Sequence, residues 1–113
     1  MKEDIETNFP QARFIAHISH WYEWGCMIYD RFIVDGDKVP RDPHEAFRLH
    51  QDIWNCGVRT ALANGGVVNA HHGVGIKLGS LMKELYGPAM QVFEGFIKQL
   101  DPNGIMNPFK LGL

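Results

Sequence analysis

The chain has 113 residues, of which 45% are hydrophobic and 12% aromatic, a composition typical of a globular domain with one core. Its formal net charge of -2 offers no basic surface for nucleic acid or an anionic membrane. No apolar run approaches the roughly 18 residues that a membrane span needs. Cys26 and Cys56 lack CxxC spacing, which predicts two reduced thiols in a cytoplasmic protein.

The N-terminal third predicts a β-hairpin. The first eleven residues show no core pattern, and residues 12–20 then alternate between apolar and polar side chains as a strand does. Residues 21–24 form the connection, and residues 25–34 form a second strand rich in β-forming residues. The edges of so small a sheet would be open, so we expect a partner, or a longer polypeptide, to cover them.

A long helix is predicted over residues 43–64. Asp42 is placed to cap its N-terminus, with Pro43 at the first helical position. Gly65 and Gly66 predict its end, because glycine enters the left-handed backbone region without a Cβ penalty. The side chains predicted to form one apolar stripe against the sheet are Phe47, Ile53, Trp54, Val58, Ala61 and Leu62.

The remaining elements are a short strand over residues 67–70 and helices over residues 79–86 and 88–99, the last ended by Asp101–Gly104. The inward side chains of the last helix are predicted to be Met90, Phe93, Phe96, Ile97 and Leu100. The predicted fold class is therefore α+β. It has a small antiparallel sheet, made of the hairpin plus one more strand, covered by one long helix and two shorter C-terminal helices.

Two adjacent imidazoles, His71 and His72, stand in a glycine-rich segment after the long helix. Gly73 and Gly75 would let the backbone approach a flat or bulky group closely. Adjacent side chains of an extended strand point to opposite faces, so His71 is predicted to line a site and His72 to be structural. In the plainer alternative, both imidazoles only satisfy backbone groups near the glycines.

Three segments occur in a recognisable order and spacing: Ile18–Tyr29, Ala61–Gly75 and Leu100–Pro108. Together they resemble the C-terminal end of the FAD-linked oxidases of the vanillyl-alcohol-oxidase superfamily, most nearly the alkyldihydroxyacetonephosphate synthase branch. The resemblance implies that residues 1–113 are the C-terminal part of the cap, or substrate, domain. It also implies that FAD is held mainly by an FAD-binding domain outside these residues, and that this chain is inactive alone.

The resemblance also assigns roles to individual residues. Tyr29 matches the family's reactive tyrosine, and His71 and His72 match two histidines that could lower the pKa of its phenol. Such help is needed because a tyrosine with its free pKa of about 10 is a poor base at neutral pH. Asn107 matches a family position close to the flavin. In the plainer interpretation, Tyr29 is a core aromatic and Asn107 belongs to an ordinary turn.

One departure from the synthase pattern and one from the pattern of the related dehydrogenases leave alternatives open. Ala70 stands where the synthases have a third histidine, and His71 stands where the related 2-hydroxy-acid dehydrogenases have glutamate. The alternatives are therefore a cap of a glycolate or D-lactate type dehydrogenase, and a non-catalytic α+β interaction or metal-binding module. No metal is expected, although His17 or His20 with His71 could form a zinc site. The expected partners are an FAD-binding domain or subunit and a small-molecule substrate, and a homodimer is left open.

Overall fold

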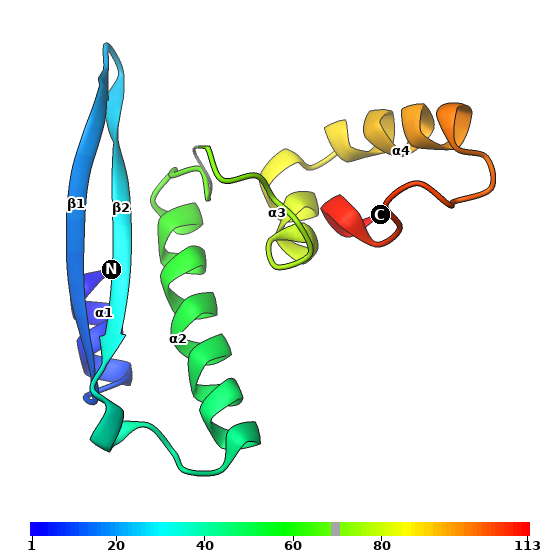
Figure 1. Ribbon diagram of the computed structural model, residues 1–113. Helices are drawn as coiled ribbons and strands as arrows, with labels where there is room; N and C mark the ends of the chain where they lie inside the picture. The colour runs from blue at the N-terminus through cyan, green and yellow to red at the C-terminus, as the bar shows by residue number, and fades with distance from the viewer. Residues whose placement is uncertain (69–70) are drawn as a thin grey trace. The chain divides into compact units, whose positions relative to one another are not determined.

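The structure is a computed structural model that describes residues 1–68 and 71–113. It divides into two compact units, Met1–Gly66 and Val67–Leu113, and each unit is described by itself (Figure 1). The fold class is α+β, as predicted, and no helix in the described residues is both long and apolar enough to cross a lipid bilayer.

The first unit is built around an antiparallel hairpin of β1 (Ala12–Tyr22) and β2 (Gly25–Val34). The predicted bounds of the second strand are confirmed. The first strand is two residues longer than predicted, because Trp21 and Tyr22 pair with Cys26 and Gly25. His20 forms a bulge just before this last stretch, with a left-handed backbone φ of 49°.

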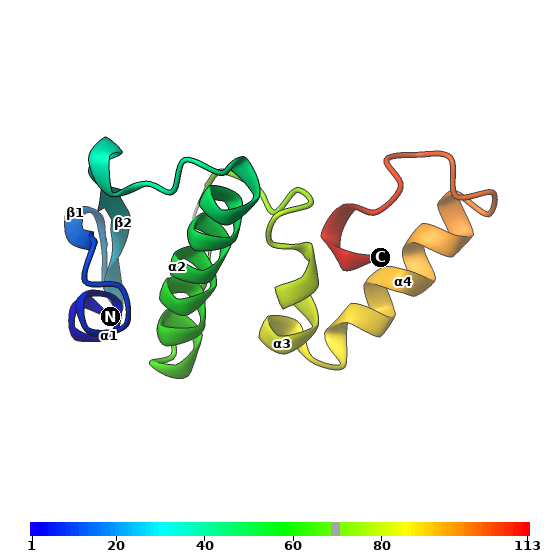
Figure 2. The ribbon, with the colours of Figure 1, turned by 90° about the horizontal axis from the view of Figure 1, so that it is seen from below.

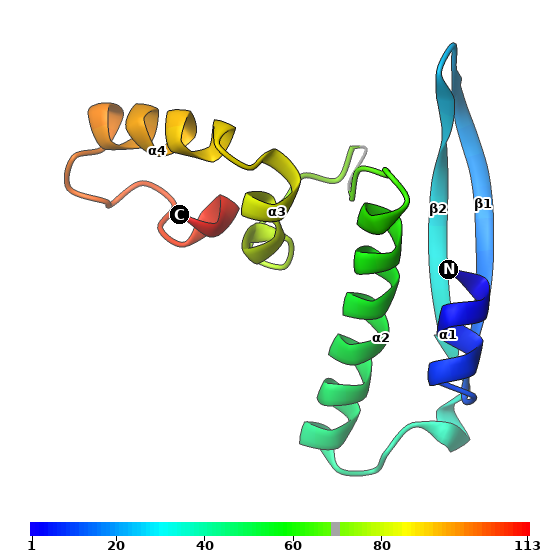
Figure 3. The ribbon, with the colours of Figure 1, turned by 180° about the vertical axis from the view of Figure 1, so that it is seen from behind.

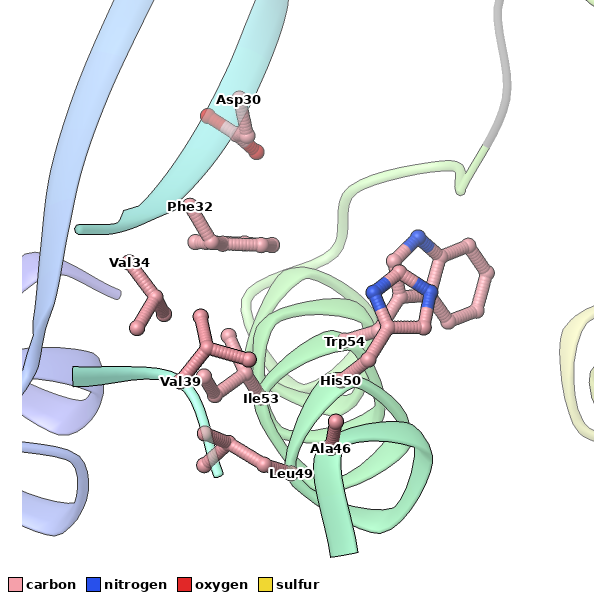
Figure 4. Close-up of a pocket in the computed structure, with 9 residues that line it drawn as sticks. All are labelled: Asp30, Phe32, Val34, Val39, Ala46, Leu49, His50, Ile53 and Trp54. Carbon is pink, nitrogen blue, oxygen red and sulfur yellow. The ribbon is translucent and has the colours of Figure 1, made fainter. Parts of the chain in front are cut away.

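The two faces of the hairpin have different surroundings. α1 (Lys2–Asn8) and α2 (Pro43–Ala63) lie on the same side of the hairpin (Figure 2). Phe32 and Val34 point from β2 toward α2 (Figure 4). Side chains alternate between the faces of a strand, so Tyr29 and its cross-strand partner His17 lie on the opposite face. This opposite face, here called the Tyr29 face, carries Arg13, Ile15, His17, Ser19, Met27, Tyr29, Arg31 and Ile33.

The N-terminal residues, predicted to lack a core pattern, form α1, and its Ile5 is completely buried. One apolar side chain in a seven-residue helix is too short a pattern to detect as a period. Ile5 forms the core of the unit with Ala12 and Ile53. The half-buried side chains packed around them are Met1, Phe9, Phe32, Val34, Leu49 and Cys56.

The predicted N-terminus of α2 is confirmed. The Asp42 carboxylate accepts a hydrogen bond of 2.9 Å from the backbone N–H of Glu45, and Pro43 occupies the first helical turn. The predicted apolar stripe is only partly correct, since the buried residues of α2 are Ile53 and Gly57, whereas Phe47 is 60% exposed. At 100° per residue, the six-residue separation of Phe47 and Ile53 places their side chains well apart around the helix.

The prediction that Gly65 and Gly66 end α2 is also confirmed. The helix ends at Ala63, and the two glycines form a Schellman motif. The N–H of Gly66 donates to the carbonyl of Ala61 at 2.9 Å, and that of Gly65 donates to Leu62 at 3.0 Å. Gly65 has a left-handed φ of 76°.

Gly65→Ala is expected to lower the free energy of unfolding of the first unit by about 1 kcal/mol, because a Cβ disfavours the left-handed backbone. Urea denaturation followed by tryptophan fluorescence measures this, since Trp21, Trp24 and Trp54 all lie in this unit. Gly36→Ala is the control, because Gly36 has open space around its Cα and no left-handed φ. Equal stability of the two variants would contradict the assignment.

The expected third strand over residues 67–70 is not found where the structure describes the chain. Val67 has irregular backbone, Val68 lies in a bend, and the rest of the predicted strand lies outside the described residues. The described sheet therefore has two strands. An isolated β-branched pair favours extended backbone, but only a neighbouring strand edge makes it a strand.

The second unit is helical. A 3-10 turn, Gly79–Leu81, leads into α3 (Met82–Tyr86), and α4 (Ala89–Leu100) follows. The 3-10 turn and α3 together span the predicted residues 79–86, and α4 is shifted by one residue from the predicted 88–99. The buried side chains are Leu78, Leu81, Met82 and Met90.

The predicted inward face of α4 is correct only for Met90. Phe93, Phe96 and Leu100 are exposed, Leu100 by 78%, and Ile97 lies at the border of exposure. The sequence of α4 has the apolar period of a helix that packs against another element, but in the described residues most of its apolar face is exposed.

Candidate functional site

Tyr29 lies on the face of the hairpin that points away from α2, directly opposite His17 in the hairpin register. Its side chain is 37% exposed, so the interpretation as a buried core aromatic is wrong. The guanidinium carbon of Arg31 lies 5.2 Å from the centroid of the Tyr29 ring, within the range of a cation–π contact. The strand thus presents a phenol and a cation together on its outer face.

Sequence reasoning overlooked Arg31, although the signal was present. It follows Tyr29 by two positions in a strand, and the period of two places both side chains on one face.

His71 and His72 lie close together in the second unit. Their ring centroids are 4.2 Å apart and the rings meet edge to face at 70°. The prediction that they point to opposite faces is wrong, because both residues lie in a bend and not in an extended strand. The two imidazoles therefore contact each other instead of pointing apart.

The glycines after this pair have a conformational role. Gly73 and Gly75 have left-handed φ values of 76° and 57°. A Cβ added to either would meet no described atom within 4 Å. Backbone conformation, not a close approach by this chain, therefore requires glycine at both positions.

Asn107 lies in the loop after α4, with a left-handed φ of 48°. The Asp101 carboxylate accepts hydrogen bonds from the backbone N–H groups of Ile105 at 3.1 Å and Met106 at 2.7 Å. Asp101 was expected only to end the helix. It does so, and it also fixes the loop that leads to Asn107.

The candidate residues therefore fall into two groups. Tyr29, with His17 and Arg31, belongs to the first unit, whereas the imidazole pair and Asn107 belong to the second. Among the described residues, no three histidine, cysteine, aspartate or glutamate side chains converge as metal ligands. Ala70, which bears on the synthase interpretation, lies outside the described residues.

A second feature of the first unit is a pocket of about 340 Å³ between β2 and α2 (Figure 4). Most of its lining is apolar, with Asp30 at one end and His50 and Trp54 on α2. Among the described residues, the Oδ1 atom of Asp30 is buried without a hydrogen-bond partner. This burial raises the pKa of Asp30, and the N-terminal ammonium opposes the rise.

Asp30→Asn is expected to stabilise the first unit at neutral pH, because it removes a charge that burial disfavours. For a carboxyl whose folded-state pKa is raised, the native state binds more protons above the ordinary pKa, so stability falls as pH rises through that range. The advantage of the variant should therefore shrink as pH falls toward the ordinary carboxyl pKa. Urea midpoints at neutral and acidic pH test this against Asp52→Asn, which changes an exposed carboxyl. A pH-independent difference would contradict it.

The fold is α+β, with Tyr29 in its first unit and the His71–His72 pair in its second. The chain belongs to the family described as FAD linked oxidases, C-terminal domain, which it matches over residues 8–111.

Known relatives agree with this assignment. An uncharacterized FAD-linked oxidoreductase of Escherichia coli (strain K12) is 35% identical over 108 residues, covering 91% of this chain and 22% of the relative. A probable mitochondrial D-lactate dehydrogenase of Danio rerio is 37% identical over 111 residues, covering 97% and 20%. The alkyldihydroxyacetonephosphate synthase of Trypanosoma brucei brucei is 30% identical over 110 residues, covering 96% and 17%. The chain thus spans about a fifth of the length of these relatives, and no solved structure matches it.

The described residues fit one side of an FAD ring system better than its pyrophosphate. The phenol and arginine of the first unit, and separately the imidazole pair of the second, are groups that can contact a flat ring or a substrate lying on it. A pyrophosphate is commonly bound at an open helix N-terminus. The N-terminus of α2, the longest helix described, is instead occupied by the Asp42 carboxylate, which repels phosphate.

Proposed function

We propose that this chain supplies the substrate side of the active site in an FAD-dependent oxidoreductase whose flavin is held by another domain or subunit. The observation that carries the proposal is the partly exposed Tyr29, on the hairpin face opposite α2, with the Arg31 cation over its ring. Membership of the FAD-linked family supports the choice of cofactor.

In this proposal Tyr29 handles a proton of the substrate while the flavin, when bound, accepts its electrons. Arg31 is proposed to hold the Tyr29 ring in place through the cation–π contact. His71 and His72 are proposed to contribute to the same active site, as a donor pair for the substrate or for the phenol. Asn107 is proposed to donate its amide to the flavin or to the main chain beside it.

The substrate is proposed from the relatives. An alkyldihydroxyacetonephosphate synthase-like reaction is the first candidate, on the residue pattern that includes Tyr29, His71 and His72. Oxidation of a 2-hydroxy acid is the second, favoured by the 37% and 32% identity to D-lactate dehydrogenases of Danio rerio and Arabidopsis thaliana. A non-catalytic metal-binding module gains no support from the described residues.

Uncovered apolar surfaces in both units support a protein partner. At the hairpin tip, Tyr22 stacks on Trp24 with ring centroids 4.9 Å apart, yet Trp24 is 83% exposed. The tip extends beyond the end of α2 (Figure 3). α4 exposes Phe93 and Leu100 in the same way. We propose that the FAD-binding part covers these surfaces, and that the assembly resides in the cytoplasm, where the free thiols of Cys26 and Cys56 stay reduced.

Co-expression with the polypeptide that carries the FAD-binding domain tests the proposal. The purified complex should contain FAD, seen as flavin absorbance, and anaerobic addition of D-lactate or other 2-hydroxy acids should bleach it if the second candidate is correct. The isolated chain titrated with free FAD should bind little. The FAD-binding polypeptide should also be tested without this chain. If its bound flavin were reduced equally fast with and without this chain, the proposed role would be contradicted.

A further inference from the structure

The Tyr29 face is positively charged. Its strand residues include two arginines and a histidine, and none of its strand residues is acidic. The charge of Arg13 is already balanced, because its guanidinium lies 2.9 Å from the Asp35 carboxylate. Arg31 has no acidic partner within residues 1–68 and 71–113, so its charge is available to a ligand.

The contact with Tyr29 leaves the hydrogen-bonding capacity of Arg31 unused. A cation–π contact forms no hydrogen bond, so the N–H donors of the guanidinium stay available to another group. Those donors match the two oxygens of a carboxylate or a phosphate in a bidentate arrangement. The contact with the ring also restricts the Arg31 side chain, which lowers the entropy cost of binding an anion.

The strand fixes where a bound anion would lie. Residues two apart on one strand face are separated by roughly 7 Å, at about 3.3 Å per residue. The anionic group of a small acid could thus bind Arg31 while a carbon atom a few bonds away in the same molecule lies at the Tyr29 phenol. His17, across from Tyr29, adds a further donor beside the same position.

We propose that Arg31 is a specificity-determining residue that binds the carboxylate or phosphate group of the substrate and so positions the reacting carbon at Tyr29. The role of Arg31 in substrate binding rests on the proposed function, but anion binding at Arg31 can be tested without flavin.

The test is an NMR titration of the 113-residue chain with inorganic phosphate, and separately with acetate, at constant ionic strength set by chloride. Saturable shifts of the Arg31 Nε–H and the Tyr29 ring signals are expected. Arg31→Gln should weaken binding at least about tenfold, as loss of a charged hydrogen-bonding partner does. Arg41→Gln, which removes an exposed arginine elsewhere in the unit, should bind as the parent does. The anion that binds more tightly identifies the substrate group.

Two results would overturn the inference. One is a shift that rises linearly without saturation, and the other is equal binding by the parent and Arg31→Gln. Arg31→Lys separates charge from geometry, because lysine keeps the charge but cannot bind in a bidentate manner, so intermediate affinity is expected. A chain that binds the anion through Arg31 but fails to affect flavin reduction in the complex would contradict the proposed function alone.

Discussion

Tyr29→Phe is expected to slow flavin reduction in the FAD-loaded complex by about 10²- to 10⁴-fold, the usual contribution of a positioned acid or base. The change removes one hydroxyl from a partly exposed side chain outside the core, so the fold and the flavin content should be retained. Anaerobic stopped-flow absorbance at the flavin band measures the rate directly.

Tyr22→Phe is the matched control, because Tyr22 is an exposed tyrosine of the same hairpin, stacked on Trp24. Its flavin reduction should be close to that of the parent. If Tyr29→Phe and Tyr22→Phe reduced flavin equally fast, Tyr29 would have no part in proton transfer, and its position on the outer face would need another explanation.

Gly57→Val is expected to lower the free energy of unfolding of the first unit by about 3 kcal/mol, the upper part of the usual range for overpacking. A Cβ built on Gly57 would overlap the ring of Phe32, whose Cε2 atom would lie 2.7 Å from it. α2 and β2 meet at this point, so either the ring must rotate away or the helix must separate from the hairpin. Urea denaturation followed by tryptophan fluorescence gives the stability.

Two further variants isolate the cause. Asn55→Val places the same side chain at an exposed position of α2, so it reports the helix propensity of valine alone, at a cost of a few tenths of a kcal/mol. Phe32→Leu combined with Gly57→Val should recover part of the lost stability, because the smaller side chain vacates the space. Additive effects in this double variant would show that the two residues do not meet as described.

The sequence predicted the elements whose ends carry local chemical signals. Asp42 and Pro43 begin α2, and Gly65 ends it with a left-handed φ, as the residue types required. β2 was predicted to the residue because glycine and aspartate border a run of β-forming side chains. Such signals depend only on the nearest few residues, which are visible in one sequence.

Features that depend on distant residues were not predictable. The burial of Ile5 depends on α2, more than forty positions away in the chain, and the exposure of Phe47 depends on which side of α2 the hairpin occupies. The pairing of His71 with His72 depends on a bend where extended backbone had been expected. In the candidate site, Tyr29 and the two histidines were identified by resemblance. Arg31 was identified only from the strand register and its contact with the Tyr29 ring.

The most direct test of the central claim is a crystal structure of this chain in complex with its FAD-loaded partner domain. We predict that the Tyr29 phenol and at least one imidazole of the His71–His72 pair border a single cavity above the flavin ring, with Arg31 at its edge. A structure in which Tyr29 is covered by a surface remote from the flavin, with the imidazole pair equally distant from the ring, would contradict the account.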